Sequence, residues 1–206
     1  MIDYFSGSSP DTKRWGFGYQ DSTTGNTAVM ADSVDGGLIM TSGTAHINQA
    51  LYMSFMNGTA TDGSDNGTVT VVPFRPFAYD GSVMIAVWRQ HSVSVGRWNG
   101  GGLAKDGRGD VSGTKMAYAY GGNSGNFYMR TANNAGSQTD VDSGVLGDIV
   151  FNTHKVECKT SSANYTLNGV MVGTSTTNLP EDELAPMFNT HRQSIISVNY
   201  CEAWNT

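Results

Sequence analysis

The sequence is poor in charged residues. They make up 15% of 206 residues, against roughly 25% in an ordinary soluble protein. The formal net charge is −6, from 12 Lys and Arg against 18 Asp and Glu, and basic residues form no run anywhere. A nucleic-acid-binding protein usually carries a basic patch or stripe. The composition therefore predicts no nucleic-acid partner.

Long apolar runs are also missing. No stretch approaches the roughly 18 apolar residues that a membrane span requires, so no membrane partner is predicted. The opening stretch "MIDYFSGSSPDTKRW" lacks the basic and apolar regions of a signal peptide. Two interpretations stay open: the sequence is a mature fragment with an added Met, or the protein does not use the secretory route.

Cysteine is nearly absent, because Cys158 and Cys201 are the only two. A small secreted fold stapled by disulfides needs more than this. Each cysteine falls in a predicted strand, and two interpretations stay open. They are either buried thiols that pack as small hydrophobic groups, or one bridge between neighbouring strands. No His stands beside them at metal-ligand spacing.

The sequence is instead rich in turn residues and in alternating apolar patterns. It holds 26 Gly and only 5 Pro, and helical periodicity is almost absent. Short runs with a period of two recur between Gly, Asn and Ser, which is typical of a sandwich or jelly roll. The predicted strands include Leu38–Thr41, His46–Asn57, Ser82–Val95, "TKMAYAYGG", "NFYMRTA", "DIVFNTHKVECKT", "NYTLNG", "VMVGTST" and "SIISVNYCEAWN". We expect one all-β domain over residues 1–206, with the Gly-rich stretch Asn99–Gly113 as a long loop.

The stretch "HKVECKTSSANYTLNGVMVG" predicts a hairpin with a two-residue corner at Asn168–Gly169. Asn and Gly tolerate the positive φ angles that a type I′ turn needs. In the strand before it, His154, Val156 and Cys158 alternate with charged residues. That strand should therefore have one buried face and one wet face.

Three stretches resemble the concanavalin A-like lectin/glucanase superfamily of laminin-G-type jelly rolls. They are "DYFSGSSPDTKRW", with Phe5, Gly7, Asp11 and Trp15 at matching positions, then "DGGLIMTSG", and the ending made of "HKVE", "YTLNG" and "ISVNYCEAW". The resemblance covers both ends of the chain and leaves the middle third unmatched. It implies an antiparallel β-sandwich of the concanavalin A-like type, and leaves function to be argued from the site.

Enzymes of this family that hydrolyse glycans carry a Glu-x-Asp-x-x-Glu-type trio on one strand, where two carboxylates act as acid and nucleophile. No such run occurs in this sequence. The acidic residues fall in stretches that we predict to be loops: Asp62, Asp65, Asp106, Asp110, Asp140, Asp142, Glu181 and Glu183. The sequence therefore predicts no catalytic residues and no enzyme.

Lyases of the same architecture use Arg, Gln, His and Tyr instead. The stretch "WRQH" at residues 88–91 offers these residue types, and Tyr118 and Tyr120 could share a face with it. A neutral His can take a proton and a Tyr can return it. A polysaccharide lyase is the third functional hypothesis, because the same residues also mark where a central strand leaves the core.

The sequence predicts no metal site and no cofactor. The stretch "DGSDNG" has oxygen ligands, but it lacks the alternating acids and closing Glu of a calcium-binding loop. The family resemblance implies a structural calcium ion near the chain ends. Asn199 stands where the family often has Asp, which removes one charge from such a site.

Surface recognition is what these observations favour. Aromatic faces stack on sugar rings and also anchor protein interfaces, although many of them could simply fill the core. The candidate ligand-binding residues are Trp88, Arg89, His91, Trp98, Tyr118 and Tyr120. We expect a non-catalytic interaction protein, namely a virion structural or decoration protein such as a phage capsid or tail component. It would pair with itself as a homo-oligomer, or with other virion proteins, in the virion. The alternative is an extracellular glycan-binding module of a secreted or surface protein.

Overall fold

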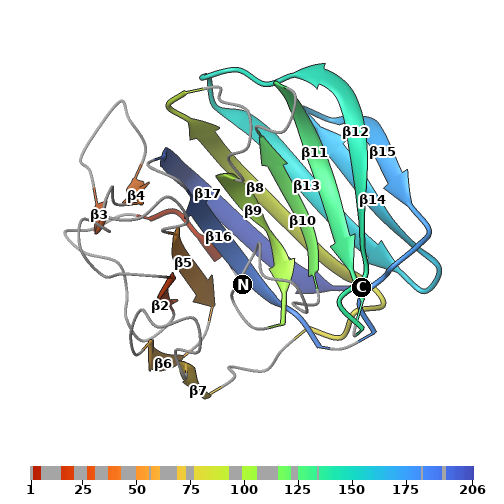
Figure 1. Ribbon diagram of the computed structural model, residues 1–206, viewed down its shortest axis with the longest axis horizontal. Coiled ribbons are helices and arrows are strands. Elements are labelled where there is room, and N and C mark those ends of the chain that lie inside the picture. The colour runs from red at the N-terminus through yellow and green to blue at the C-terminus, as the bar shows by residue number, and fades with distance from the viewer. Residues whose placement is uncertain are drawn as a thin grey trace.

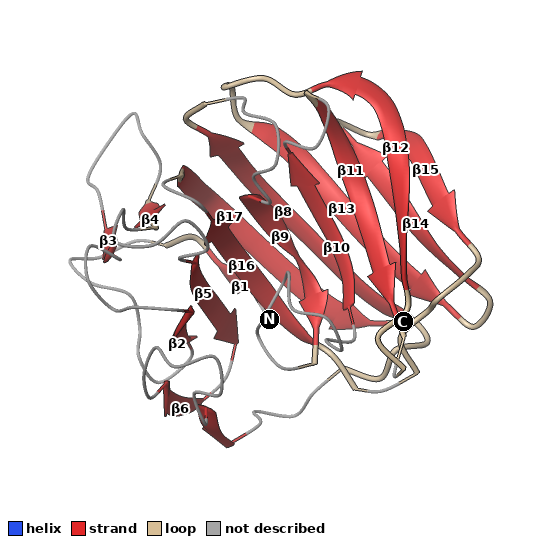
Figure 2. Cartoon of the chain, in the orientation of Figure 1, coloured by secondary structure: helices blue, strands red, loops and turns tan. Residues whose placement is uncertain are grey.

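The computed structural model describes residues 2–5, 15–20, 27–30, 37–42, 50–55, 57–60, 69–72, 77–92, 99–105, 116–121, 125–133, 135–181, 183–191 and 194–206. These residues form 17 strands and no helix (Figures 1 and 2). Within them, nothing therefore has the length and apolar character of a membrane-spanning helix. The predicted all-β class is confirmed.

Two large antiparallel sheets stack face to face (Figure 1). Sheet A has the order β15 (Val170–Ser175), β14 (Ser162–Leu167), β13 (Asn152–Lys159), β8 (Ser82–Gln90), β17 (Ile195–Asn205), β4 (Leu38–Thr41) and β3 (Thr27–Met30), and β1 (Ile2–Asp3) also pairs with β17. Sheet B has the order β12 (Gln138–Leu146), β11 (Asn126–Ala132), β10 (Met116–Gly121), β9 (Asn99–Ala104), β16 (Ala185–His191), β5 (Ala50–Phe55) and β2 (Trp15–Gln20). The strands β6 (Asn57–Ala60) and β7 (Val69–Val72) form a separate two-stranded sheet, and β6 contacts β2. The predicted concanavalin A-like jelly roll is confirmed.

The main core lies between the sheets, because alternate residues of each strand face inward. Trp88, Tyr165, Phe127 and Phe188 are among its fully buried side chains. The indole of Trp88 meets the ring of Phe127 edge-on at 5.9 Å between ring centroids, which joins sheet A to sheet B. Burial of such large rings, each worth about 1.5–3 kcal/mol relative to exposure, is what holds the two sheets together.

The first and last parts of the resemblance meet in this core, because Phe5 and Trp15 belong to the same cluster of buried residues as Tyr165 and Val198. Phe5 packs on Trp15 at 5.4 Å between ring centroids, and the ring of Phe188 contacts both. Asn199 stands where the family often has Asp, and the structure gives its side chain a structural partner. Asn199 lies at a bulge where β17 changes register against β8, and its Oδ1 accepts a hydrogen bond from the backbone N–H of Gly37 at 3.0 Å.

The predicted strands at Leu38–Thr41, His46–Asn57 and Ser82–Val95 contain β4, β5 and β8, and their unmatched ends lie partly outside the described residues. The prediction of a loop over Asn99–Gly113 is wrong for its first part, because residues 99–104 form the strand β9. Glycine has a low β propensity, so the stretch "NGGGLA" gives no sign of a strand in the sequence. The reason for glycine is local: a Cβ on Gly100 would come within 2.1 Å of the Ala119 carbonyl oxygen on β10.

The hairpin prediction is confirmed. Asn168 and Gly169 have φ of 49° and 83°, as a type I′ corner requires. The Asn168 side chain also holds the corner to β13, since its Oδ1 accepts from the N–H of Thr153 at 2.8 Å and its Nδ2 donates to Asn152 Oδ1 at 2.6 Å. In β13, His154, Val156 and Cys158 are buried, while the charged residues between them are partly or fully exposed.

The two cysteines are buried free thiols, which is the first of the two interpretations. Both lie on strands of sheet A and belong to the core cluster between the sheets. Cys201 pairs in register with Ala86 on β8, and β8 separates β17 from the β13 strand that carries Cys158. Burial raises the pKa of the Cys158 thiol to about 12, so this sulfur stays protonated and unreactive.

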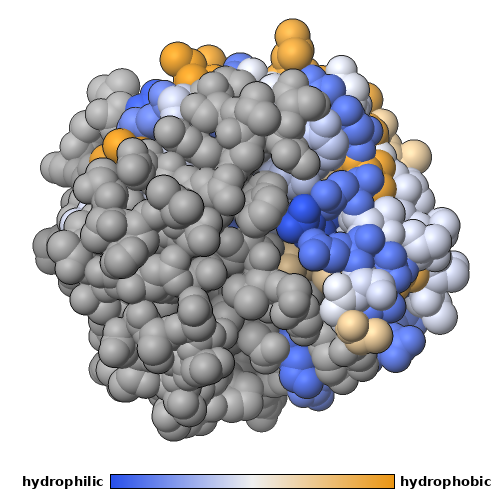
Figure 3. Space-filling model, viewed as in Figure 1, coloured by the Kyte–Doolittle hydropathy of each residue, from blue (hydrophilic) through white to orange (hydrophobic). Residues whose placement is uncertain are grey.

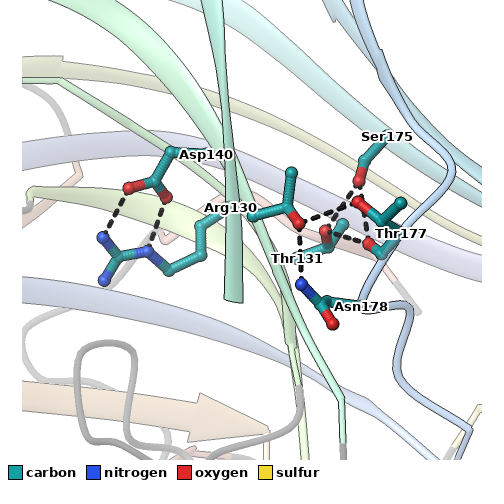
Figure 4. A network of polar contacts seen from close by, with 7 residues as sticks. Arg130, Thr131, Asp140, Ser175, Thr177 and Asn178 are labelled. Carbon is teal, nitrogen blue, oxygen red and sulfur yellow. Dashed lines mark hydrogen bonds and ion pairs between the residues drawn. The ribbon is translucent and has the colours of Figure 1, made fainter. Parts of the chain in front are cut away.

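A network of uncharged groups joins the margins of the two sheets (Figure 4). Thr131 Oγ1 on β11 lies 2.8 Å from Ser175 Oγ on β15, and it donates to the carbonyl oxygen of Thr177 at 3.0 Å. Thr139 Oγ1 on β12 contacts Thr177 Oγ1 at 2.8 Å and accepts from Asn178 Nδ2 at 2.9 Å. We call this set of five residues the hydroxyl seam.

Candidate functional site

Asp140 and Asp142 lie in the middle of β12, side by side on one face. The prediction that these acids fall in a loop is therefore wrong. Positions two apart in a strand point the same way, and Asp140 pairs in register with Arg130 while Asp142 pairs with Tyr128. All four belong to the outer face of sheet B, which is the face turned away from sheet A.

A bulge shapes the surroundings of Asp142. The pairing of β11 with β12 shifts register between Asn126 and Tyr128, and Gly144 takes a φ of 69° on the opposite strand. This conformation turns the Gly144 N–H onto Asp142 Oδ1 at 2.8 Å. Bulges often re-aim groups in this way next to functional sites.

Asp142 accepts two further partners. Asn126 Nδ2 donates to its two oxygens at 2.9 and 3.1 Å, and the Tyr128 hydroxyl donates to Oδ2 at 3.1 Å. The backbone hydrogen bond from Gly144, helped by those from Asn126 and Tyr128, lowers the pKa of Asp142. Asp142 is exposed and Tyr128 is half-buried. Asp142 is therefore an ionised, oriented carboxylate at the surface.

Asp140 forms a two-point ion pair with Arg130 (Figure 4). Arg130 Nε donates to Oδ1 at 2.7 Å and a terminal nitrogen donates to Oδ2 at 2.8 Å. The side chain of Arg130 is 8% exposed and that of Asp140 30% exposed. Burial works against the charge of Arg130, but the hydrogen bonds to Asp140, together with the electrostatic interactions with Asp140, Tyr120 and Tyr118, outweigh it and raise the pKa of the guanidinium. A carboxylate can accept about four hydrogen bonds, so Asp140 can accept others besides those from Arg130, and the Tyr120 hydroxyl is one neighbouring donor.

Three tyrosines run across the same face beside these acids. Tyr118 and Tyr120 stack at 5.8 Å between centroids, and Tyr120 and Tyr128 stack at 5.5 Å. The Arg130 guanidinium carbon lies 5.5 Å from the centre of the Tyr120 ring. Tyr118 and Tyr120 are fully buried, whereas Tyr128 reaches the surface. We call these three residues the tyrosine ladder.

Figure 3 shows this side in space-filling form, with hydrophilic atoms gathered where Figure 1 draws β11 and β12. The exposed part of the site is the group Asn126, Tyr128, Asp140 and Asp142, which we call the Asp142 patch. It combines one aromatic edge, one amide and two carboxylates. Such a set accepts hydrogen bonds from hydroxyl groups and packs on an apolar ring face.

The structure does not bring together the five predicted ligand-binding residues that it describes. Tyr118 and Tyr120 lie on the outer face of sheet B. Trp88 is fully buried between the sheets, where its ring stacks on His154. Arg89 and His91 lie on the other side of the molecule, at the outer face and end of β8, and His91 Nε2 is 2.7 Å from Ser197 Oγ.

Trp98 lies outside the described residues. The arrangement expected for a lyase, with His91 beside Tyr118 and Tyr120, is therefore not formed, because the two sheets separate them. The alternation in β8 that buries Trp88 turns its neighbour Arg89 outward.

No strand in the described part of the chain carries the Glu-x-Asp-x-x-Glu trio. The outer-face positions of β10 hold Met116, Tyr118 and Tyr120. Across the same described ranges, no three His, Cys, Asp or Glu side chains gather closely enough to hold a metal ion.

Sequence reasoning missed the residues of the Asp142 patch and Arg130. A signal for them exists in "QTDVDSG", where Thr139 and Val141 alternate with the two acids. That period of two indicates a strand with one polar face. The pairing of Asp140 with Arg130 leaves no such trace, because it depends on the register of β11 against β12.

No protein-family model matches the chain, and neither does any curated protein sequence. Solved structures do match over nearly the whole length. One comes from work on endo-acting O-glycanases with which members of the human gut microbiota initiate mucin breakdown; its TM-score is 0.68 with 11% identity, over 100% of this chain and 98% of that chain. A β-1,3-glucanase from Mycobacterium marinum has a TM-score of 0.58 with 13% identity, over 99% and 97% of the two chains. The carbohydrate recognition domain of Emp47p has a TM-score of 0.58 with 10% identity, over 98% and 93%.

At these identities the likeness establishes the fold, and the resemblance to the concanavalin A-like lectin/glucanase superfamily is confirmed at that level. Two predictions are overturned by the same matches. The prediction of a virion structural or decoration protein is wrong, because the matching structures are those of glycan-degrading and glycan-recognising proteins. The prediction of a chain that is not an enzyme is also wrong as an inference from the fold, because glycanases and glucanases share it.

Proposed function

We propose that the protein is a carbohydrate-active protein that binds a glycan along the outer face of sheet B. The observation that carries the proposal is the Asp142 patch beside the tyrosine ladder. Asp142 is ionised and held by three donors, and Tyr128 presents a half-buried ring next to it. Similarity in fold to glycanases and to a carbohydrate recognition domain supports the same assignment.

The chemistry of the patch suits a sugar. The hydroxyl groups of a sugar can donate hydrogen bonds to Asp140. They can also donate to the Tyr128 oxygen, whose own O–H donates to Asp142. The apolar C–H face of a pyranose packs on an aromatic ring. Because hydrogen bonds already orient the side chains of Asp140 and Tyr128, these side chains lose little conformational freedom on binding.

Hydrolysis makes a further demand that these groups do not meet by themselves. A glycosidase needs one carboxyl that stays protonated long enough to act as general acid. Asp140 is paired with Arg130, and the pKa of Asp142 is lowered. Recognition is therefore the function that the described geometry supports best, and turnover is measured alongside it.

The test is an array of neutral and amino-sugar oligosaccharides, followed by calorimetry on the glycans that bind. Tyr128→Ala should weaken binding by about tenfold, the equivalent of roughly 1.4 kcal/mol. Lys155→Ala is the matched control, because Lys155 lies on β13 facing away from sheet B. Release of reducing ends from the bound glycans is assayed with the wild type and Asp142→Asn. A chain that binds no glycan on the array contradicts the proposal.

A further inference from the structure

Six of the seven large hydrophobic side chains that are exposed among the described residues gather at one end of the sandwich. They are Val145, Leu146, Ile149, Val150, Val170 and Met171, which we call the apolar tip. Leu146 is 73% exposed and Met171 is 66% exposed. Figure 3 shows orange atoms along the upper rim, where Figure 1 draws the end of β12 and the loop that leaves it. Single apolar residues are ordinary on a surface, but a contiguous group marks an interaction site.

Hydrogen bonds hold the two halves of the apolar tip together. Asp148 is the only charged residue in the stretch "VLGDIVF", and its Oδ1 accepts from the N–H of Val150 at 3.2 Å and from Asn152 Nδ2 at 2.7 Å. Asn152 Nδ2 also donates to the carbonyl oxygen of Val150 at 3.2 Å, and Asn152 Oδ1 accepts from Asn168 Nδ2 at 2.6 Å. Asn168 is the corner residue that leads into β15. These polar groups are thus used within the chain, while the apolar side chains beside them face water.

The apolar tip is continuous with the Asp142 patch. Leu146 on β12 pairs in register with Asn126 on β11. Side chains directly opposite each other in an antiparallel pair lie on one face, with Cβ atoms about 5 Å apart. Asn126 belongs to the Asp142 patch and donates to Asp142 Oδ1 at 2.9 Å. A ligand that covers the patch and extends past the end of β12 therefore meets Leu146 first and the rest of the apolar tip after it.

A second copy of the chain fits this end of the molecule poorly. Six aliphatic side chains expose on the order of a few hundred Å², whereas a stable protein interface takes about 800 Å² from each partner. The two edge strands beside the tip, β12 and β15, each carry a register shift against the neighbouring strand. Bulges of this kind protect edge strands from pairing with another chain. Lipid chains cover apolar side chains without a paired strand, because the hydrophobic effect has no directional requirement.

We propose that the glycan bound by this protein is the headgroup of a glycolipid, an inference that rests on the proposed glycan-binding function. The sugar occupies the Asp142 patch, and the apolar tip enters the lipid layer beside it. The ionised Asp142 and the formal net charge of −6 disfavour an anionic surface. The headgroup is therefore neutral, and the lipid layer around it is uncharged.

The test measures binding to vesicles. The oligosaccharide that binds best on the array is coupled to an uncharged dialkylglycerol and carried in phosphatidylcholine vesicles. We expect the wild type to bind these vesicles at least about tenfold more tightly, per accessible headgroup, than it binds the free oligosaccharide in calorimetry. Plain phosphatidylcholine vesicles should bind weakly. Equal binding to plain vesicles and to glycolipid vesicles overturns the inference.

Ile149→Ser/Val150→Ser separates lipid contact from sugar recognition. Both side chains are exposed and lie outside the Asp142 patch, so the melting temperature and the affinity for the free oligosaccharide should stay level. The tighter binding to glycolipid vesicles should disappear. Met171→Ser, on the other turn, should reduce it several-fold. Tyr4→Ser is the matched control, because Tyr4 is the exposed hydrophobic side chain outside the tip, 5.1 Å from the ring of Tyr200, and its loss should leave vesicle binding unchanged.

The remaining outcomes distinguish failure of the inference from failure of the proposed function. A free oligosaccharide that binds as tightly as the glycolipid vesicles overturns the inference and leaves the proposed function standing. Tighter vesicle binding that survives Ile149→Ser/Val150→Ser does the same. A dimer in sedimentation that this variant dissociates would assign the apolar tip to a protein contact and also overturn the inference. Binding of no glycan on the array overturns both.

Discussion

The imidazole of His154 lies flat against the indole of Trp88, with ring centroids 3.9 Å apart and planes 13° from parallel. His154 Nδ1 is 2.8 Å from the Tyr165 hydroxyl, and the imidazole is fully buried between the sheets. Burial lowers the pKa of His154 to about 3. The imidazole is therefore a neutral part of the core.

This arrangement predicts how acid weakens the fold. The pKa of His154 is depressed in the folded chain, so its contribution is complete above the unfolded value near 6.5 and is lost as pH falls toward about 3. Between these two pH values the unfolded chain binds a proton at His154 and the folded chain does not. The free energy of unfolding therefore falls by up to about 1.4 kcal/mol per pH unit. Urea unfolding at several pH values gives the unfolding free energy as a function of pH, and we expect this free energy to fall less steeply with acid for His154→Phe than for the wild type. Identical slopes for the two proteins would disprove the assignment.

Arg130 and Asp140 should be coupled in stability. Asp140→Ala leaves a guanidinium buried without its carboxylate, which should cost about 2–3 kcal/mol of unfolding free energy. Arg130→Met/Asp140→Ala should cost less than the two single variants added together, with a coupling of about 1–2 kcal/mol. Chemical denaturation of all four proteins measures this cycle. Additive costs would show that the pair contributes nothing as a pair.

The Asn168–Gly169 corner should separate conformation from hydrogen bonding. Asn168→Gly keeps the positive φ but removes two side-chain bonds to β13, so we expect a loss of about 1–2 kcal/mol. Gly169→Ala keeps those bonds but places a side chain at φ of 83°, where no other atom lies within 4 Å, so only backbone strain of about 1 kcal/mol is expected. Thermal melts decide, and Lys159→Ala on the exposed face serves as the neutral comparison. Unchanged melting of Asn168→Gly would rule out the tie to β13.

Gly100→Ala should be among the most damaging small substitutions in sheet B. Its Cβ would meet the Ala119 carbonyl oxygen at 2.1 Å and the Tyr120 Cα at 2.9 Å, and both are backbone atoms that move only with their strand. We expect a loss of about 3 kcal/mol or more. Gly125→Ala, where φ is 88° but nothing lies within 4 Å, should lose only about 1 kcal/mol. Equal losses would mean that β9 and β10 do not approach so closely.

Glycan affinity should be insensitive to mild acid. The hydrogen bond from Gly144, together with those from Asn126 and Tyr128, keeps the pKa of Asp142 below its ordinary value, so its charge is present above that value and disappears only as pH falls through the lowered one. Affinity measured by calorimetry should therefore stay level from about pH 8 to about pH 5. Asp142→Asn should bind more weakly at every pH in that range. A loss of affinity on moving from pH 8 to pH 5 would implicate another titrating group.

The sequence predicts the sandwich well where apolar residues alternate. β4, β8, β13 and the corner at Asn168 follow from local patterns, because each carries its own signal in neighbouring residues. The prediction fails at β9, because Gly100 and Gly102, which allow the close approach of β10, make the stretch look like a loop in the sequence. The prediction also fails at β12, which is an edge strand. Only Thr139 and Val141 mark its period of two, and the polar residues around them make the stretch look like a loop.

The site could be predicted only in part. Tyr118 and Tyr120 are among the residues predicted to bind a ligand, because aromatic side chains in a β pattern stand out from the sequence alone, and the structure places them beside Tyr128 and Arg130. Asp142 was missed because its orientation depends on the bulge at Gly144, and Arg130 because its partner lies on the next strand. Such pairings depend on strand register, which residue type alone does not specify. For the same reason, the sequence pattern grouped Arg89 and His91, on sheet A, with Tyr118 and Tyr120, which lie on the outer face of sheet B.

The hydroxyl seam consists entirely of neutral donors and acceptors. Dissolved ions largely screen exposed charges that are more than about 10 Å apart at 0.1 M salt, and more than about 3 Å apart at 1 M. The hydroxyl seam has no charged group on which this screening could act. The hydrogen-bonded contact between β12 and β15 should therefore persist at molar salt concentrations. Small molecules that compete for hydrogen bonds are the solutes that would open it.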